Sequence, residues 1–299
     1  MRRCHGDLHL RNVCLFEGRP TLFDCLEFSD EFASVDVLYD VAFLLMDLEH
    51  RGFAHFSNLV LNRYLDLTGE DDGLAAMPLF LSSRAAIRAH VTAAALERAT
   101  EPKLRPQMAA EARSYLELAA QFLRPGSCRL VAIGGPSGTG KSSLAAALAP
   151  SLGARVLRSD VIRKRLFAVA PETRLPPTAY TSQVSRRVYQ TLRRKAAEAL
   201  AAGYSVITDA VSLKPSERQS FVAVAEAAGV PFAGLWLEAP PATMDRRLRA
   251  RRHDASDASP EVLQQQLQQD PGTVEWGRID AGTGPEGCLS AARRALELS

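Results

Sequence analysis

A glycine-rich loop between an apolar run and a helix-forming run constrains the fold more than any other feature of the chain. Residues 134–143 read "GGPSGTGKSS" and have the spacing of a phosphate-binding Walker A loop. The apolar run "CRLVAI" precedes the loop and "SLAAALA" follows it, so a buried strand and a helix are predicted on its two sides. Backbone N–H groups of such a loop and of the first helical turn converge on phosphate oxygens. The predicted contact residues are Gly135, Pro136, Ser137, Gly138, Thr139, Gly140, Lys141, Ser142 and Ser143.

After the loop, strand-like runs alternate with helix-like runs. The runs "RVLRSD", "YSVITDA" and "PFAGLWLEAP" are predicted strands, followed by helices that begin near Val161, Pro215 and Pro241, and "EGCLSAARRALEL" is a predicted closing helix. Such alternation favours a mostly parallel sheet with helices on both faces. Since "RPGS" at residues 124–127 interrupts the preceding helical pattern, we predict a three-layer α/β P-loop NTPase domain of the AAA ATPase type over residues 125–299.

Polar residues at the ends of the predicted strands are expected to meet the loop, because ligands bind beyond the carboxyl ends of parallel strands. Asp209, which ends "YSVITD", is expected to hold Mg²⁺ together with Ser142, unless it only begins a turn. Asp160 is expected to accept the proton of an attacking hydroxyl; the alternative is an N-cap for the helix that follows. Arg163, three residues further on, is expected to hold an anionic group or the moving phosphoryl.

An arginine-rich segment later in the chain is a candidate lid over the phosphates. Arg247 and Arg251 are four residues apart, hence on one face of a helix, and are predicted to neutralise charge on the transferred group. The other arginines, at positions 246, 249 and 252, are predicted to lie on the surface. A nucleic-acid patch is the alternative, but no aromatic residue that could stack on a base lies among them.

The first part of the chain carries a second pattern of phosphotransferases. His5, Asp7 and Asn12 fit the His-x-Asp-x-x-x-x-Asn spacing of a kinase catalytic loop, although only four residues precede His5. Residues 13–24 read as two short strands around "EGRP", and residues 35–122 show apolar positions every three or four residues. A mainly helical domain over residues 1–124 is therefore predicted.

These residues carry two resemblances. Residues 128–299 resemble the small P-loop kinases of the gluconate kinase, zeta-toxin and polynucleotide kinase group, through the Walker A loop, the Asp160-x-x-Arg163 pair and the paired lid arginines. The resemblance implies a sheet order of 2-3-1-4-5, a substrate-side base at Asp160 and a phosphorylated hydroxyl as product. It leaves the acceptor open.

Residues 5–122 resemble the C-terminal lobe of aminoglycoside-phosphotransferase-like kinases, in which Asp7 and Asn12 match the catalytic loop. The resemblance implies that Asp24 is a second metal-binding residue and that Asp40 braces the loop. The whole chain resembles bacterial two-domain proteins that join such a lobe to a P-loop kinase-like domain. It looks shortened at its N-terminus, so we expect a vestigial or incomplete first domain, without the lobe that covers ATP.

The sequence thus predicts an ATP- and Mg²⁺-dependent phosphotransferase that acts on a small-molecule or nucleotide-type hydroxyl. A net charge of +2 favours neither nucleic acid nor a membrane surface as partner, and no apolar run approaches the ~18 residues of a spanning helix. Five scattered cysteines indicate reduced thiols and a cytoplasmic location. Two alternatives stay open: a nucleotide-binding regulatory module without turnover, and an aminoglycoside-type kinase whose missing lobe is supplied by another chain.

Overall fold

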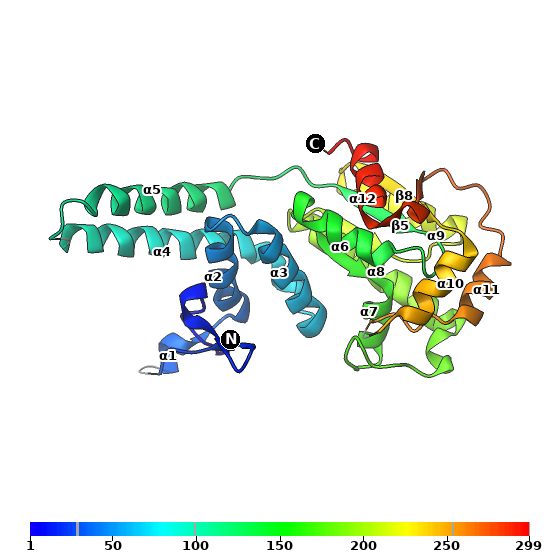
Figure 1. The fold of residues 1–299 in the computed structure, drawn as a ribbon, viewed down its shortest axis with the longest axis horizontal. Helices are drawn as coiled ribbons and strands as arrows, with labels where there is room; N and C mark the ends of the chain where they lie inside the picture. The colour runs from blue at the N-terminus through cyan, green and yellow to red at the C-terminus, as the bar shows by residue number, and fades with distance from the viewer. Residues whose placement is uncertain (28–29, 99, 253, 299) are drawn as a thin grey trace. The chain divides into compact units, whose positions relative to one another are not determined.

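The computed structural model describes residues 1–27, 30–98, 100–252 and 254–298, which form two compact units. The first unit comprises residues 1–61 and 72–125, and the second comprises residues 62–71 and 126–299 (Figure 1). The domain bounds expected from the sequence, residues 1–124 and 125–299, stay a prediction.

The second unit is built on a five-stranded sheet. In sheet order the strands are β6 (Arg155–Arg158), β7 (Val206–Asp209), β5 (Leu130–Gly134), β8 (Phe232–Glu238) and β9 (Gly277–Asp280). All neighbouring strands are parallel. Numbered along this unit, the order is 2-3-1-4-5, which confirms the predicted topology. The central strand β5 leads directly into the glycine-rich loop.

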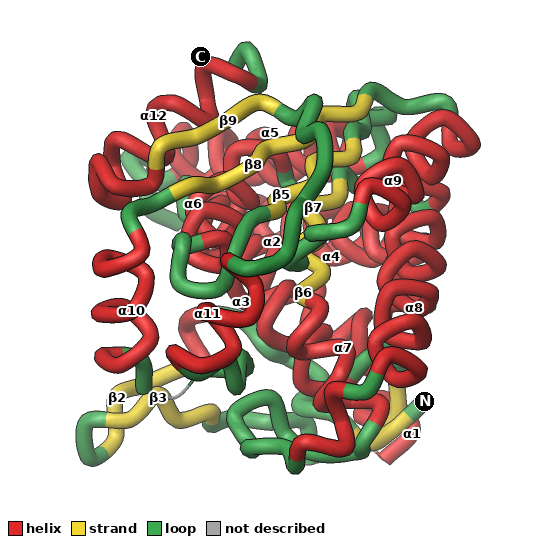
Figure 2. The backbone as a smooth tube through the Cα atoms, turned by 90° about the vertical axis from the view of Figure 1, so that its right-hand side faces the viewer, coloured by secondary structure: helices red, strands yellow, loops and turns green. Residues whose placement is uncertain are grey.

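Helices cover both faces of this sheet, as Figure 2 shows. One face is packed against α6 (Lys141–Leu152) and α12 (Gly284–Ala295), and the other against α8 (Ser182–Ala201) and α9 (Pro215–Ala228). Val131, Ile133 and Leu148 belong to the buried core between the sheet and the first pair of helices. The three-layer α/β P-loop NTPase architecture predicted from strand–helix alternation is therefore confirmed.

Two α-helices and one strand of this unit were not predicted. Helix α8 has an apolar face that includes Val188, Leu192 and Ala196, whereas β9 buries only Ile279 and α11 (Pro260–Leu267) buries only Leu263. The other short elements are α7 (Ser159–Leu166), η3 (Pro177–Tyr180), α10 (Pro241–Ala250) and η4 (Ala281–Thr283).

The N-cap alternative for Asp160 is wrong. Helix α7 begins at Ser159 and its N-cap is Arg158, so Asp160 lies inside the first helical turn. Strand β6 runs directly into the helix, which leaves no turn in which Asp160 could be the cap. The negative charge of its carboxylate can stabilise the N-terminal end of α7 through the helix dipole.

Residues 62–71 cover the outer edge of strand β6. The Asn62 side chain donates to the Ala154 carbonyl at 2.9 Å and accepts from the Val156 N–H at 2.7 Å, as a neighbouring strand would. Arg155, which is 4% exposed, pairs with Asp66 at 2.8 Å and with Asp71 at 2.7 Å. The edge strand is thus closed by side chains from a segment that precedes the phosphate loop by more than sixty positions.

The first unit is mainly helical. Its helices are α1 (Asp30–Ala33), α2 (Val37–His50), the first half of α3 (Ala54–Thr68), α4 (Met77–Arg98) and α5 (Arg105–Phe122), with the 3₁₀ turns η1 (Leu10–Asn12) and η2 (Asp71–Ala76). Strand β1 (Arg2–Arg3) pairs with β4 (Ser34–Val35), and β2 (Val13–Phe16) pairs with β3 (Arg19–Leu22) in the predicted hairpin. Helices α2, α4 and α5 enclose a small core that contains Phe43, Met46 and Tyr115.

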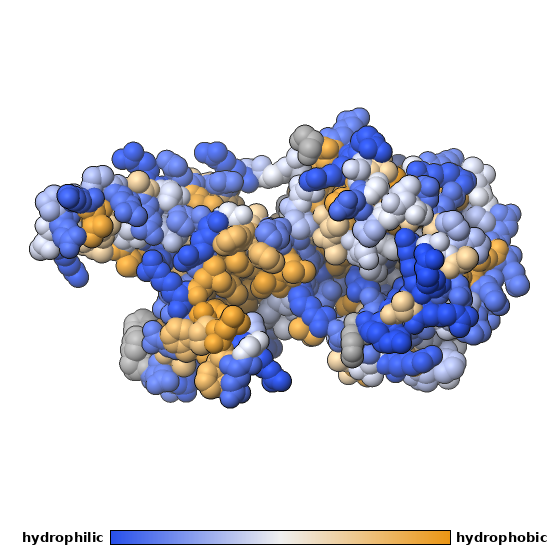
Figure 3. Space-filling view, in the orientation of Figure 1, coloured by the Kyte–Doolittle hydropathy of each residue, from blue (hydrophilic) through white to orange (hydrophobic). Residues whose placement is uncertain are grey.

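Apolar surface gathers over the first unit in Figure 3. Its exposed apolar side chains include Leu15, Phe16, Leu22 and Phe23 from the β2–β3 hairpin and the residue after it. In the part of the chain that the structure describes, no helix combines the length and the apolar character that crossing a bilayer requires.

Candidate active site

The glycine-rich loop leaves β5 in a conformation that side chains would block. Gly135 has φ 125° and Gly138 has φ 84°, both in the left-handed region that favours glycine. A Cβ on Gly135 would collide with the Leu237 carbonyl, and one on Gly138 would come 2.7 Å from the Met244 carbonyl. The path of the loop therefore requires glycine at both positions, which fits the predicted nucleotide site.

Lys141 lies along this loop at the start of α6. Its side chain is buried, and Nζ donates to the Gly135 and Pro136 carbonyls at 2.8 Å each. Burial lowers the pKa of Lys141, while the nearby carboxylates of Asp209 and Asp160 act in the opposite direction. The cation is thus held against carbonyls of the loop, with two carboxylates close enough to affect its charge.

A pair of oxygen donors lies beside the lysine. Ser142 Oγ donates to Asp209 Oδ2 at 2.6 Å, which joins the first turn of α6 to the end of β7. Hydroxyl and carboxylate oxygens are the ligands that Mg²⁺ prefers, so this pair fits the predicted metal site. Ser143, the next residue, is exposed.

Arg158 was missed by the sequence analysis. It ends strand β6, and its guanidinium lies 3.1 Å from Ser142 Oγ, 3.4 Å from Asp209 and 3.0 Å from Asp254. Its place immediately before the "SD" dipeptide was the available signal, because the carboxyl ends of all these strands meet at one edge.

Asp160 lies close to this group. Burial raises the pKa of the Asp160 carboxyl, and the negative charge of Asp209 raises it further, while a hydrogen bond with Ser256 acts in the opposite direction. A carboxylate with increased proton affinity is suited to accept a proton from a hydroxyl. The structure therefore brings together Lys141, Ser142, Asp160 and Asp209, as the strand order predicts.

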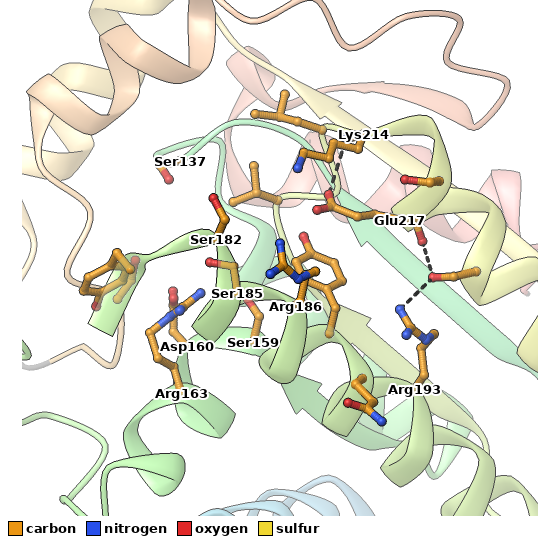
Figure 4. Close-up of a pocket in the computed structure, with 18 of the residues that line it drawn as sticks. Ser137, Ser159, Asp160, Arg163, Ser182, Ser185, Arg186, Arg193, Lys214 and Glu217 are labelled. Carbon is orange, nitrogen blue, oxygen red and sulfur yellow. Dashed lines mark hydrogen bonds between the residues drawn. The ribbon is translucent and has the colours of Figure 1, made fainter. Parts of the chain in front are cut away.

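A cleft of about 1870 Å³ opens from the loop residue Ser137 toward α7, α8 and α9. Asp160 and Arg163 line it on one side, as Figure 4 shows. Arg163 is 7% exposed; Nη1 donates to the Ala179 carbonyl at 2.7 Å, and the guanidinium lies 4.7 Å from the centre of the Tyr180 ring. Among the described residues its Nε atom has no hydrogen-bond partner.

The two lid candidates have different surroundings. Arg247 donates to the Thr139 carbonyl at 3.1 Å and to the Ala281 carbonyl at 2.8 Å, so it braces the phosphate loop from α10. Arg251 follows α10, and its positive charge acts on both Lys141 and Asp254. Its buried Nη1 atom has no hydrogen-bond partner within the described ranges. Arg251 is therefore the candidate with a donor free for a phosphate, and Arg247 is a brace.

The arginines predicted to lie on the surface are exposed. Arg246 and Arg252 are exposed, and Arg249 pairs with Asp245 at 2.7 Å on the solvent side of α10.

Gln266 on α11 also reaches the loop and was missed by the sequence analysis. Its Oε1 accepts from the Ser137 N–H at 2.8 Å. No signal pointed to this residue, because α11 itself was not predicted and a glutamine carries no charge pattern.

The kinase-like loop of the first unit is held by a buried carboxylate. Asp40 accepts from the His5 N–H at 3.0 Å and from the Gly6 N–H at 2.9 Å, and Arg84 donates to the Gly6 carbonyl at 3.3 Å. The Asp40 carboxylate thus fixes the backbone of the loop.

The three predicted residues of that first-unit site are only partly brought together. Asn12 Nδ2 donates to the Asp7 carboxylate at 3.1 Å. In the described residues no hydrogen bond joins Asp24 to either of them, and no group of three or more His, Cys, Asp or Glu side chains is arranged to hold a metal ion.

Comparison with known families agrees with the second unit's geometry. Residues 130–270 match the family model described as an AAA domain. The second unit has the P-loop NTPase fold. In this P-loop unit the matched range runs from the first residue of β5 to a position just after α11, so it contains the phosphate loop, Asp160 and the lid arginines.

The chain also has relatives of greater length. An uncharacterized protein of Mycobacterium tuberculosis (strain ATCC 25618 / H37Rv) is 33% identical over 262 residues, which are 86% of this chain and 52% of the relative. An uncharacterized protein of Mycobacterium bovis (strain ATCC BAA-935 / AF2122/97) has the same identity and coverage. The chain thus spans about half the length of the curated relatives it matches.

Solved structures with similar folds include two kinases. A sugar kinase from Janibacter sp. HTCC2649 is 20% identical, with a TM-score of 0.44, and the match covers 58% of this chain and 96% of that one. A gluconokinase from Sinorhizobium meliloti 1021 is 22% identical, with a TM-score of 0.42, and the match covers 58% and 92% respectively.

Proposed function

We propose that the P-loop unit transfers the γ-phosphoryl group of ATP to a hydroxyl group of an acceptor held in the cleft. The observation that carries the proposal is the position of Asp160. Its carboxyl has a raised pKa, and it lines the same cleft that begins at Ser137 of the phosphate loop. A binding module would need the loop but not a proton acceptor on the far side of the phosphates.

The donor half of the proposed site consists of the loop and its neighbours. The loop amides and Lys141 bind phosphate oxygens, and Ser142 with Asp209 would hold Mg²⁺. When bound there, Mg²⁺ offsets the negative charge of the phosphates. Arg158 lies within reach of Ser142 and Asp209 and adds positive charge to the same region.

The acceptor half consists of Asp160 and Arg163. Asp160 accepts the hydroxyl proton while the hydroxyl oxygen forms its bond to the γ-phosphorus; the bond from that phosphorus to the ADP oxygen breaks, and ADP leaves. Arg163 and Arg251 stabilise the negative charge on the moving group.

Arg251→Ala is expected to lower the rate of transfer by about 10²-fold or more and to weaken ATP binding much less, because charge neutralisation matters most in the transition state. Single-turnover rates and ATP affinities of the variant and the parent protein test this. The matched control is Arg246→Ala, which removes an exposed arginine from α10 and should change neither value. Weaker binding with an unchanged rate would instead make Arg251 a ground-state contact.

The experiment that tests the function is ATP consumption by the purified protein with Mg²⁺ and a panel of sugars, aminoglycosides, nucleosides and nucleic-acid ends. Transfer of radiolabelled phosphate to one acceptor class supports the proposal. Tight stoichiometric ATP binding with no turnover on any acceptor would support the regulatory-module alternative. Activity on an aminoglycoside that appears only when a polypeptide with a nucleotide-binding lobe is added would support the second alternative, an aminoglycoside-type kinase completed by another chain.

For the first unit we propose an incomplete aminoglycoside-phosphotransferase-like lobe that takes no part in this reaction. Asp7→Ala is expected to change ATP turnover by less than about twofold, because Asp7 forms its contacts with Asn12 and His9 inside the first unit. Steady-state ATP turnover of the variant measures this, with circular dichroism as a check of folding. Loss of turnover in a folded Asp7→Ala protein would make the first unit an active part of the enzyme.

A further inference from the structure

We infer that the acceptor is an anion: a hydroxyl compound that also carries a phosphate or carboxylate group, bound in the cleft by Arg163 and Arg186. The inference rests on the proposed function, since it names the substrate class of the same site. It adds a specificity residue, Arg186, which lies on helix α8 and was not expected from the sequence.

The charge of the cleft lining points to an anion. Its cationic side chains outnumber its carboxylates by six to three: Arg163, Arg174, Arg186, Arg193, Arg194 and Lys214 against Asp160, Glu217 and Asp257. One group of each sign is already paired: Asp257 accepts from Lys164 and, at 2.5 Å, from the Tyr180 hydroxyl, and Arg194 pairs with Glu198 on α8. A concave surface with an excess of one sign of charge concentrates ligands of the opposite sign.

Two arginines of this lining have donors that the protein does not use. The Arg163 side chain is buried, yet its Nε atom has no hydrogen-bond partner among the described residues. Arg186 lines the cleft with an exposed side chain, and its guanidinium forms no ion pair or hydrogen bond with any residue in the described ranges. A planar guanidinium matches carboxylate and phosphate oxygens two at a time, so these donors suit an anionic ligand.

Helix α8 presents Arg186 beside other polar groups. Ser182, Ser185, Arg186 and Tyr189 recur at helical spacing and all line the cleft. In Figure 4 Ser182, Ser185 and Arg186 lie near Asp160 and Arg163, while Lys214 and Glu217 lie across the pocket. An anion held by Arg163 and Arg186 therefore has its neighbouring hydroxyls within the region of the proposed base.

The test compares charged and neutral members of the same compound pairs: AMP with adenosine, ribose 5-phosphate with ribose, and gluconate with glucose. Binding is measured by calorimetry with Mg²⁺ and a saturating non-hydrolysable ATP analogue, so that the phosphate loop is already filled. Transfer from ATP is measured separately with radiolabelled phosphate. We expect at least one charged compound to bind more tightly than its neutral partner. Comparison of the two phosphate compounds with gluconate, a carboxylate, then identifies the kind of anion.

Arg186→Gln is expected to weaken binding of the charged compound about tenfold or more, the usual loss for a charge-assisted hydrogen bond. The matched control is Arg187→Gln, because Arg187 is the next residue on α8 and is exposed like Arg186, but it does not line the cleft. It should leave affinity within about twofold.

Three outcomes would overturn the inference: no charged compound binds better than its neutral partner, Arg186→Gln has no effect, or Arg187→Gln weakens binding equally. If an anion binds through Arg186 but no compound is phosphorylated, the inference stands and the proposed transfer fails. If a neutral compound is phosphorylated without any effect of Arg186→Gln, the transfer stands and the inference fails.

Discussion

Lys141→Ala is expected to abolish ATP-dependent transfer while the protein stays folded. The change removes the cation that the loop carbonyls hold in place, and phosphoryl transfer depends on positioning and on charge stabilisation at that point. Among the described residues, the hydrogen bonds of the Lys141 ammonium go to the Gly135 and Pro136 carbonyls of the loop. The thermal midpoint should therefore change little.

The measurement is transfer of radiolabelled phosphate by Lys141→Ala beside the parent protein, with near-ultraviolet circular dichroism as the check of folding. Lys103→Ala is the control, because it removes an exposed lysine of the first unit and should leave the rate unchanged. Unchanged turnover in a folded Lys141→Ala protein would falsify the placement of the active site at this loop.

Asp160→Asn is expected to lower the transfer rate by roughly 10²–10⁴-fold, the usual contribution of a positioned general base. ATP affinity should stay close to that of the parent protein, because the amide keeps the size of the carboxyl and Asp160 does not belong to the phosphate loop. Rapid-quench rates and ATP binding by calorimetry separate the two effects.

The pH dependence provides a second measurement on the same residue. Burial and the Asp209 charge raise the pKa of Asp160, and the base works only when its proton is off. The rate of the parent protein should therefore fall as the pH falls through that raised pKa, above the range of an ordinary aspartate. The acid limb should be absent from the profile of Asp160→Asn.

The control for this variant is Asp270→Asn, which changes an exposed aspartate whose oxygen accepts from the Gly272 N–H at 2.8 Å. It should leave the rate and its pH profile unaltered. A loss of thermal stability in Asp160→Asn with normal turnover would show that the carboxylate serves helix α7 and not the reaction.

The sequence was sufficient to predict the parts of this site that local chemistry determines. The glycine spacing, the apolar run before it and the helix-forming run after it predict the loop and its two flanking elements. Since strand ends of a parallel sheet meet at one edge, the positions of Asp160 and Asp209 in the chain also predict their proximity to Ser142. That proximity follows from topology alone.

The rest of the site depends on contacts that leave no local pattern. Gln266 reaches the Ser137 N–H from a helix that buries one leucine, and Arg247 reaches two carbonyls that are far from it in sequence. The cap alternative for Asp160 failed because the strand passes directly into α7, which propensity does not reveal. Helix α8 carries apolar residues at helical spacing, among them Val188, Leu192 and Ala196, so the helix itself could have been predicted, but no local pattern distinguishes Arg186 from its other arginines.

The closure of strand β6 by residues 62–71 has a consequence for dissecting the chain. A fragment that starts at residue 126 would lose Asp66 and Asp71 and leave the Arg155 guanidinium buried without its carboxylates. Breaking a buried ion pair in this way costs roughly 3–5 kcal/mol, a large share of the ~5–15 kcal/mol that holds a domain together. Because β6 leads straight into α7, we expect this loss to affect Asp160 and Arg163. A stable P-loop unit is therefore expected to need residues 62–71 in addition to residues 130–270, which match the AAA-domain model.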